Sequence, residues 1–337
     1  MSTRPEVPSA TLETRPRRNG KGERAMVPEA EPRSYYDQPV IQEPVWTWEI
    51  PIYFFVGGMA GASAGLAYMA HLQGNNELSR RAWAISLAGI HVSPMLLISD
   101  LGRPARFLNM LRMFKITSPM SVGSWILATT GGAVTVSAAH AWTGVFPGLA
   151  RSGRLVAALA GMPLATYTGA LIGNTAVPAW HKARHFLPFV FAGGAAASAG
   201  AAAVLATPGK HAEPARRLAV IGAALEIGAA QGMEHAAGFE GEPYKKGLPG
   251  ALSKLATATT AAGAGLLAKG GRRRSDRTLA KVGAGLLLAG AFTERWAIFR
   301  AGFKSASEPK YTVGPQRERI RKGESLGAAR MPGNRPG

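Results

Sequence analysis

Three long stretches without a charged residue constrain the fold of this chain more than any other feature. No Asp, Glu, Lys or Arg occurs in residues 82–99, 116–150 or 155–181. A run of about 18 or more apolar residues is long enough to cross the hydrocarbon core of a bilayer as a helix. The mean hydropathy of +0.03 conceals this, because it averages polar ends with an apolar middle. The sequence therefore predicts an all-α integral membrane protein.

Apolar segments divide the chain into eight candidate spans between two polar tails. The predicted spans are 50–72, 82–100, 120–143, 155–174, 185–206, 218–236, 248–268 and 279–299. An even number of spans places both termini on one side of the membrane, and the long basic tails favour the cytoplasmic side. Residues 1–45 are rich in Pro, Arg and Glu and have no apolar segment, so we expect a disordered tail there. We expect residues 301–337 to form a basic C-terminal tail.

Glycines at steps of four residues predict close contacts between spans. Gly57, Gly61 and Gly65 follow this spacing in the first span, and Gly169 and Gly173 follow it in the fourth. Small residues let membrane helices approach closely where lipid offers no hydrophobic drive. We interpret these glycines as packing positions.

The composition excludes several kinds of site. The chain has no cysteine, which rules out disulfides, thiol catalysis and an iron–sulfur cluster held by this chain. Two histidines would have to lie at one depth on facing helices to hold a haem. His91 lies in the middle of its span and His140 near the end of the next, so we expect neither haem nor a metal site.

The net charge of +19 does not indicate a nucleic-acid partner. The basic residues lie in loops, such as Arg272 to Arg274, and in the C-terminal tail, without interleaved aromatic residues. Basic clusters next to membrane spans bind anionic lipid head groups. We therefore expect these residues to contact the lipid membrane or a protein partner.

Four motifs carry a resemblance to a known family. They are the pair Gly57-Gly58, the turn SDLGRPARF at 99–107, the segment SPMSVGSW at 118–125 and the triplet YTG at 167–169. In this order they resemble the NrfD/PsrC family of polysulfide-reductase-type membrane subunits. The resemblance is strong over residues 46–180, and beyond that only the pattern of spans agrees.

The resemblance implies a fold and a function. It implies two four-helix bundles, a first over residues 46–180 with a quinone site and a second over 181–300. The family exchanges electrons between the quinone pool, menaquinone or ubiquinone, and a ferredoxin-like iron–sulfur subunit. That subunit relays them to or from a catalytic subunit, often a molybdopterin enzyme. The expected location is the bacterial plasma membrane.

Residues near the start of the first span and in the fourth span are candidate quinone contacts. A quinone site needs a hydrogen-bond donor at a carbonyl oxygen, a proton route and an apolar sleeve. Tyr167 is the best donor, and it matches the family's quinone-contacting tyrosine. Glu49 and Tyr53 lie one turn apart at the membrane entrance. The resemblance implies polar quinone contacts in this turn, including an Asn and a His, and this chain departs from that pattern with Ile50 and Tyr53 in their places. The alternative for each tyrosine is an interfacial aromatic residue.

A carboxylate and two arginines mark the end of the second span. Asp100 is costly at a membrane boundary unless it is paired or hydrated. It either forms a structural ion pair with Arg103 or delivers protons to the quinone, and the two roles are compatible. Arg103 and Arg106 are expected to hold the turn.

Two further carboxylates lie on the sixth span. Glu226 and Glu234 are eight residues apart and share a helix face. Aligned polar groups in a bilayer usually face a bundle interior or a water-filled path. One interpretation is a proton channel in the second bundle. The other places Glu234 at the interface and buries only Glu226.

A proton-coupled transporter without a redox role is the alternative function. Transporter folds usually carry internal repeats with broken helices in matching positions of both halves. The chain contains no convincing repeat, which favours the redox interpretation.

Overall fold

The computed structural model describes residues 39–269 and 274–321. This part of the chain is helical and contains no strand, so the all-α prediction is confirmed. Its long helices, each of 20 residues or more, are α1 (Glu49–Leu72), α2 (Asn76–Asp100), α4 (Pro119–Thr143), α5 (Pro147–Gly173), α7 (Leu187–Ala206), α8 (Glu213–Ala236), α10 (Gly247–Lys269) and α11 (Arg274–Ser307). The shorter helices are η2 (Pro104–Arg106), α3 (Phe107–Met110), α6 (Pro178–Lys182), α9 (Glu242–Lys245) and α12 (Lys310–Arg321).

Six of the long helices are long and apolar enough to cross a membrane: α1, α2, α4, α5, α7 and the part of α11 from 277 onward. The chain is therefore a multi-pass membrane protein. α8 and α10 have 24 and 23 residues, which is sufficient length, but they are less apolar than the other six. Glu226 and Glu234 interrupt the apolar sequence of α8, and Lys254 interrupts that of α10, although both helices are continuous. The prediction of eight spans is confirmed for six of them.

Several helices extend beyond the apolar segments that predict them. α2 begins at Asn76, where the side chain of Asn75 accepts a hydrogen bond from the backbone N–H of Leu78 at 3.2 Å. α11 continues to Ser307, past the predicted end at 299. Helix ends are set by caps and hydrogen bonds, whereas hydropathy detects only the segment suited to lipid. The predicted helices are therefore too short where their terminal turns carry charged residues.

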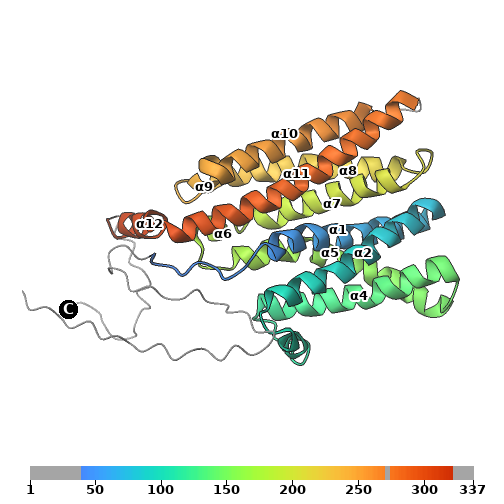
Figure 1. Cartoon of the computed structure of the whole chain (residues 1–337), viewed down its shortest axis with the longest axis horizontal. Helices are drawn as coiled ribbons and strands as arrows, with labels where there is room; N and C mark the ends of the chain where they lie inside the picture. Colours follow the sequence, from blue (N-terminus) through green and yellow to red (C-terminus); the bar gives the residue numbers. More distant parts are fainter. Residues whose placement is uncertain (1–38, 270–273, 322–337) are drawn as a thin grey trace, which may run out of the picture.

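The long helices run back and forth along one direction (Figure 1). We call the end where α1, α4, α7 and α10 begin the proximal end, and the other the distal end. The described chain enters α1 and leaves α11 at the proximal end, where α12 also lies.

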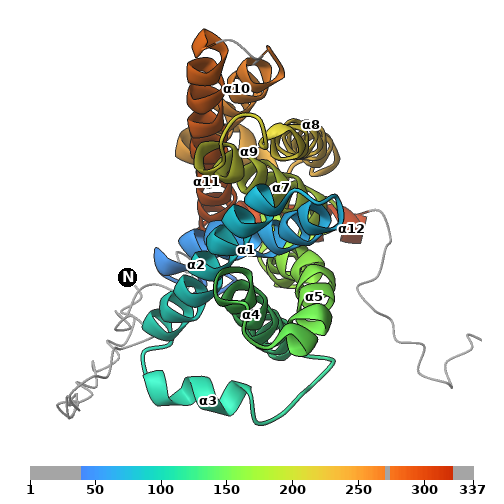
Figure 2. The same ribbon diagram turned by 90° about the vertical axis from the view of Figure 1, so that its right-hand side faces the viewer.

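Neighbouring helices pack in antiparallel pairs that share one core. α1 packs against α2 and α5, α4 packs against α5, α7 against α8, and α10 against α11. Seen along the helices, α1 and α7 lie between α4–α5 and α10–α11 (Figure 2). Buried side chains form a continuous apolar cluster from Ala60 of α1 through Ala201 of α7 to Leu287 of α11. The division into two four-helix bundles stays a prediction.

The closest approach of α1 and α5 occurs at two glycines. A β-carbon at Gly161 would lie 2.5 Å from the carbonyl oxygen of Gly61, closer than two such atoms can approach. Gly61 therefore is the packing position that its spacing predicts. The same prediction is wrong for Gly65, because a β-carbon there would meet nothing within 4 Å.

The C-terminal segment begins with helical structure at the proximal end. Tyr311 of α12 donates a hydrogen bond to Glu242 of α9 at 3.1 Å, and Lys310 lies 3.6 Å from the same carboxylate. The hydrogen bond from Lys246 is the largest contribution that lowers the pKa of the Glu242 carboxyl. The predicted N-terminal tail up to residue 38, the loop residues 270–273 and the C-terminal residues 322–337 lie outside the described residues.

Candidate functional site

Two buried tyrosines meet between α1 and α5 near the proximal end. The hydroxyl groups of Tyr53 and Tyr167 are hydrogen-bonded to each other, and either oxygen can be the donor. Tyr53 is 1 % exposed and Tyr167 is partly buried. The contact between the two hydroxyls lies within the fold, between α1 and α5. The structure brings together two residues that are 114 positions apart in the sequence.

A glycine of α4 provides the space for the Tyr167 ring. α4 begins at Pro119, and the hydroxyl of Ser118 accepts a hydrogen bond from the backbone N–H of Ser121 at 3.4 Å. A β-carbon at Gly123, one turn further, would overlap the Tyr167 ring. The segment SPMSVGSW thus starts α4 and places its glycine against the tyrosine. Its contribution to this site is structural and could not be assigned from the motif alone.

The tyrosine pair lines a narrow pocket of about 70 Å³. Most of the lining is apolar and includes Ile50, Leu97, Leu127 and Leu171, together with Phe107 and Met110 from the connection between α2 and α4. Asp100 and Ser124 add polar groups. A pocket of this character has hydrogen-bonding groups at one point and an apolar wall elsewhere, as small-molecule sites do.

Asp100 and Glu49 are buried and are linked through Thr47. The backbone N–H of Thr47 donates to Asp100 Oδ1 at 3.0 Å, and the Thr47 hydroxyl lies 2.8 Å from the same oxygen. That hydroxyl is also hydrogen-bonded to Glu49 Oε2. Because a hydroxyl has a single proton to donate, it can donate to only one of the two carboxylates at a time.

The expected ion pair between Asp100 and Arg103 is not formed among the described residues. Asp100 is 7 % exposed and its hydrogen bonds come from Thr47 instead. Gly102 has a φ of +72°, and this left-handed residue turns the chain away from α2 before Arg103. Arg103 and Arg106 flank η2 and are exposed at the proximal end. They belong to the turn, as predicted, without reaching the carboxylate.

A second buried polar cluster joins α8 to α11. Arg295 is 2 % exposed, and its Nη1 lies 3.3 Å from Oε1 of Glu226, which is 3 % exposed. The Arg295 guanidinium also donates to the carbonyl oxygen of Phe191 at 2.9 Å and lies 4.2 Å from the centre of the Phe191 ring. A charged side chain inside a membrane protein is stabilised by such a partner and by backbone carbonyls.

The cluster continues through Ser253 of α10. The Ser253 hydroxyl lies 3.4 Å from Glu234 and 3.5 Å from Glu294, which is itself buried. Glu226 and Glu234 therefore face neighbouring helices, as their spacing predicts. Sequence reasoning missed Arg295, Glu294 and Ser253. The adjacent charged residues at 294–295, within an otherwise apolar span, were the signal in the sequence that could have indicated this cluster.

Several buried polar atoms of this cluster have no hydrogen-bond partner among the described residues. They are Glu226 Oε2, Glu294 Oε1, Arg295 Nε and the hydroxyl oxygen of Tyr244. Buried polar atoms normally have a protein or water partner. Such atoms are the expected contacts of internal water.

The histidines considered for haem ligation bond to the backbone. Nδ1 of His91 lies 2.9 Å from the carbonyl oxygen of Leu87, and Nδ1 of His140 lies 2.9 Å from that of Val145. Within the residues that the structure describes, no group of three or more His, Asp or Glu residues could hold a metal ion.

A family model described as polysulfide reductase, of the NrfD type, matches residues 34–307. The chain belongs to the NrfD polysulfide reductase family. The match extends from α1 to α11, so the resemblance first carried by the motifs of residues 46–180 is confirmed and reaches through the second half of the chain. No curated protein matches the sequence. Membership makes the chain a membrane subunit of the polysulfide-reductase type.

In this NrfD-family subunit, the variant Gly123→Ala should displace the Tyr167 ring. Overpacking of a buried site costs about 1–3 kcal/mol, so the free energy of unfolding in detergent should fall by about that amount. Gly132→Ala on the same helix is the matched control, because a β-carbon there meets nothing within 4 Å. In a Tyr167→Ala background the effect of Gly123→Ala should largely disappear. Equal stability of the two glycine variants would contradict the assigned contact.

Proposed function

We propose that this chain is the quinone-reactive membrane subunit of a multi-subunit oxidoreductase. The observation that carries the proposal is the Tyr53–Tyr167 pair, which lines an apolar pocket beside the buried Asp100. Family membership supports it, because polysulfide-reductase-type subunits work with catalytic and iron–sulfur subunits. In this proposal the long helices form two four-helix bundles in a bacterial plasma membrane, with both termini in the cytoplasm.

The tyrosine pair can provide what a quinone carbonyl needs. A tyrosine hydroxyl donates a hydrogen bond while the phenol stays neutral. When a quinone carbonyl replaces one tyrosine as acceptor, Tyr167 donates to it and Tyr53 donates to Tyr167. Reduction to quinol takes up two electrons and two protons, and the hydrogen bond stabilises the negative charge that develops on the oxygen. The proposed substrate is menaquinone or ubiquinone.

The pocket must widen for a quinone ring to enter. Its 70 Å³ is below the range of about 300–1,000 Å³ for small-molecule sites. Phe107 and Met110 cover it from the connection between α2 and α4, and α3 in that connection lies outside the helix bundle (Figure 2). Leu108 and Ile116 of the same connection are exposed and apolar. Movement of this connection at the membrane interface is the proposed entry step.

We assign proton delivery to the carboxyl groups at the proximal end. Asp100 lines the pocket, and Thr47 links it to Glu49. A hydroxyl between two carboxyl groups can accept a proton from one and donate its own to the other. In this role Glu49 passes protons through Thr47 to Asp100 and from there to the quinone.

The proximal end is the proposed docking face for a ferredoxin-like iron–sulfur subunit. The tyrosine pair lies near this end, so a cluster docked here is closer to the quinone than one at the distal end. Arg103, Arg106, Arg112 and Lys115 are exposed in the connection beside the pocket. Exposed charges of this kind mainly increase the association rate with an acidic partner. In this proposal a catalytic subunit of the molybdopterin type exchanges electrons with that partner.

We assign proton passage through the second half to the cluster around Arg295. Glu226, Glu234 and Glu294 come from α8 and α11, and Ser253 of α10 joins two of them. Water bound to the unpartnered oxygens of Glu226 and Glu294 would extend these contacts into a path. A transporter without redox role would use the same cluster, and that alternative is distinguished by whether the tyrosine pocket reacts with quinone.

Tyr167→Phe should slow quinone turnover of the assembled complex. The change removes one hydroxyl, and a substrate hydrogen bond of this kind contributes about 1–3 kcal/mol, so the rate should fall by roughly tenfold or more. Tyr68→Phe is the matched control on α1, because Tyr68 does not line the pocket. Unchanged turnover in Tyr167→Phe, with the protein inserted, would contradict the quinone assignment.

Asp100→Asn should slow turnover more than it weakens quinone binding. Asn accepts the same hydrogen bonds from Thr47 but cannot take up and release a proton. Assembly should survive, and the dependence of turnover on pH should change. Thr47→Val should reproduce part of the loss and Thr47→Ser should not, because only serine retains the hydroxyl. Loss of assembly with normal turnover of the surviving complex would assign Asp100 a structural role.

Glu294→Gln should reduce proton translocation by the reconstituted complex while quinone turnover continues. It removes a titratable group and keeps the side-chain size near Ser253. Glu226→Gln differs, because it leaves Arg295 buried without its carboxylate and should lower the unfolding free energy by about 3–5 kcal/mol. The measurement is the number of protons moved for each quinone reduced. An unchanged ratio in Glu294→Gln would remove this cluster from the proton path.

A further inference from the structure

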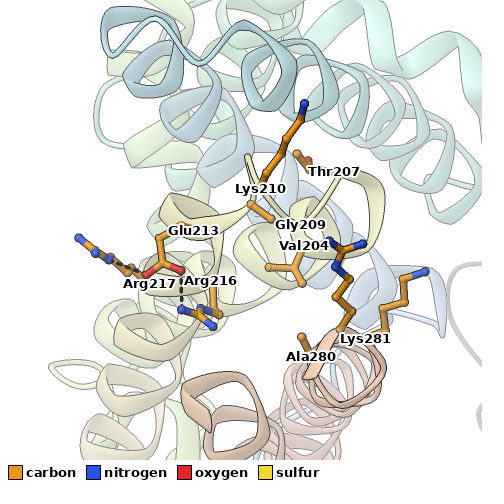
Figure 3. A pocket seen from close by; sticks show the side chains of 11 residues that line it. Val204, Thr207, Gly209, Lys210, Glu213, Arg216, Arg217, Ala280 and Lys281 are labelled. Atoms are coloured by element: carbon orange, nitrogen blue, oxygen red, sulfur yellow. Dashed lines mark hydrogen bonds and ion pairs between the residues drawn. The ribbon is translucent and has the colours of Figure 1, made fainter. Parts of the chain in front are cut away.

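A basic pocket lies at the distal end, remote from the tyrosine pair. It has a volume of about 730 Å³ and lies between the connection of α7 to α8 and the first turns of α11. Its charged lining is Lys210, Glu213, Arg216, Arg217, Arg277 and Lys281. The α8 residues lie on one side of the pocket and Lys281 of α11 lies on the other (Figure 3). Basic residues from three segments of the chain therefore line one space.

Most of this positive charge has no internal counter-charge. Glu213 is the one carboxylate among the lining residues, and it pairs with Arg216 and with Arg217, at 3.0 Å for Arg217. Within the described part of the chain, Lys210, Arg277 and Lys281 form no ion pair. Positive charges held together repel one another, so an anion bound between them would be favoured.

A buried hydroxyl adds a second, independent sign of a ligand. Thr207 ends α7, lines the pocket and is 6 % exposed. Its hydroxyl oxygen has no hydrogen-bond partner among the described residues. A buried hydroxyl without a partner is unfavourable by about 1–3 kcal/mol. An anion in the pocket would accept a hydrogen bond from this hydroxyl.

We propose that this pocket binds a phosphate group, supplied by the head group of an anionic phospholipid or by free phosphate. Arginine and lysine are the side chains that bind phosphate oxygens most strongly. The pocket lies at the end of the membrane-spanning helices, where lipid head groups are found, and its volume exceeds what one phosphate ion fills. The bound group would tie α8 to α11. The proposal concerns the distal end and does not depend on the quinone site.

The test uses the full-length protein purified in detergent. Retained lipid is counted by native mass spectrometry after exposure to equal amounts of phosphatidylglycerol, cardiolipin or phosphatidylcholine, and thermal stability is measured in parallel. The anionic lipids should be retained preferentially and should raise the melting temperature. A separate titration with inorganic phosphate distinguishes the sources: if phosphate alone stabilises the protein and displaces lipid at millimolar concentration, free phosphate is the ligand, and otherwise the head group is.

The double variant Arg277→Gln and Lys281→Gln removes two charges from one wall of the pocket. Affinity for anionic lipid should fall by roughly fivefold for each basic side chain lost. Thr207→Val keeps the charge and should weaken binding by a smaller factor. Arg151→Gln is the matched control, since Arg151 is exposed at the same end but does not line the pocket.

Three results would overturn the proposal. They are equal retention of phosphatidylcholine and the anionic lipids with no effect of inorganic phosphate, unchanged binding of both anions by the double variant, and a loss in Arg151→Gln as large as in the double variant. The last would mean that anions follow the general charge of this face and not the pocket. Thr207→Val distinguishes the two explanations. Binding through the general charge of this face would be unchanged in this variant, whereas binding in the pocket would be weakened.

Discussion

The close approach of α1 and α5 at Gly61 and Gly161 determines where the tyrosine pair lies. Tyr53 precedes Gly61 by about 12 Å along α1, and Tyr167 follows Gly161 by about 9 Å along α5, at 1.5 Å per residue. Because the two helices are antiparallel, both displacements lead towards the proximal end. Contact of the glycines therefore brings the two hydroxyls to similar depth, and Gly123 of α4 leaves room for the second ring.

A bilayer offers no water to a buried polar group, and this explains how the charged residues are arranged. Asp100 and Glu49 share Thr47, and Arg295 has Glu226 together with a backbone carbonyl. Asp100, Glu226 and Arg295 are each buried together with a partner from another segment of the chain. Removing one partner of a buried ion pair destabilises the fold, because the other charge then remains unpaired in an apolar environment. Polar contacts of this kind fix which helices are neighbours in a core made largely of alanine and leucine.

The sequence predicts the helices better than it predicts their contacts. Charge-free runs locate six spans because lipid selects for hydropathy, whereas α8 and α10 carry the polar groups of an internal cluster and are less apolar. The site residues Tyr53, Tyr167 and Asp100 were identified, and the structure places them around one pocket. Thr47 and Arg295 were not, because their roles depend on partners about 50 and 70 positions away. An ion pair with Arg103 was one of two roles expected for Asp100, and among the described residues the hydrogen bonds of Asp100 come from Thr47 instead.

The tyrosine pair and the cluster around Arg295 lie at different positions along their helices, and this separates their proposed roles. Tyr53 lies about 6 Å along α1 from its first residue, and Tyr167 about 9 Å from the last residue of α5, so the proposed quinone site is close to the proximal end. Glu226 lies about 20 Å along α8 from one end and about 15 Å from the other, near the middle of the helix. Protons for the quinone can enter at the proximal end without crossing this cluster. In the proposed mechanism, quinone chemistry is therefore separable from proton passage through the second half, and a change at Glu294 affects the second without the first.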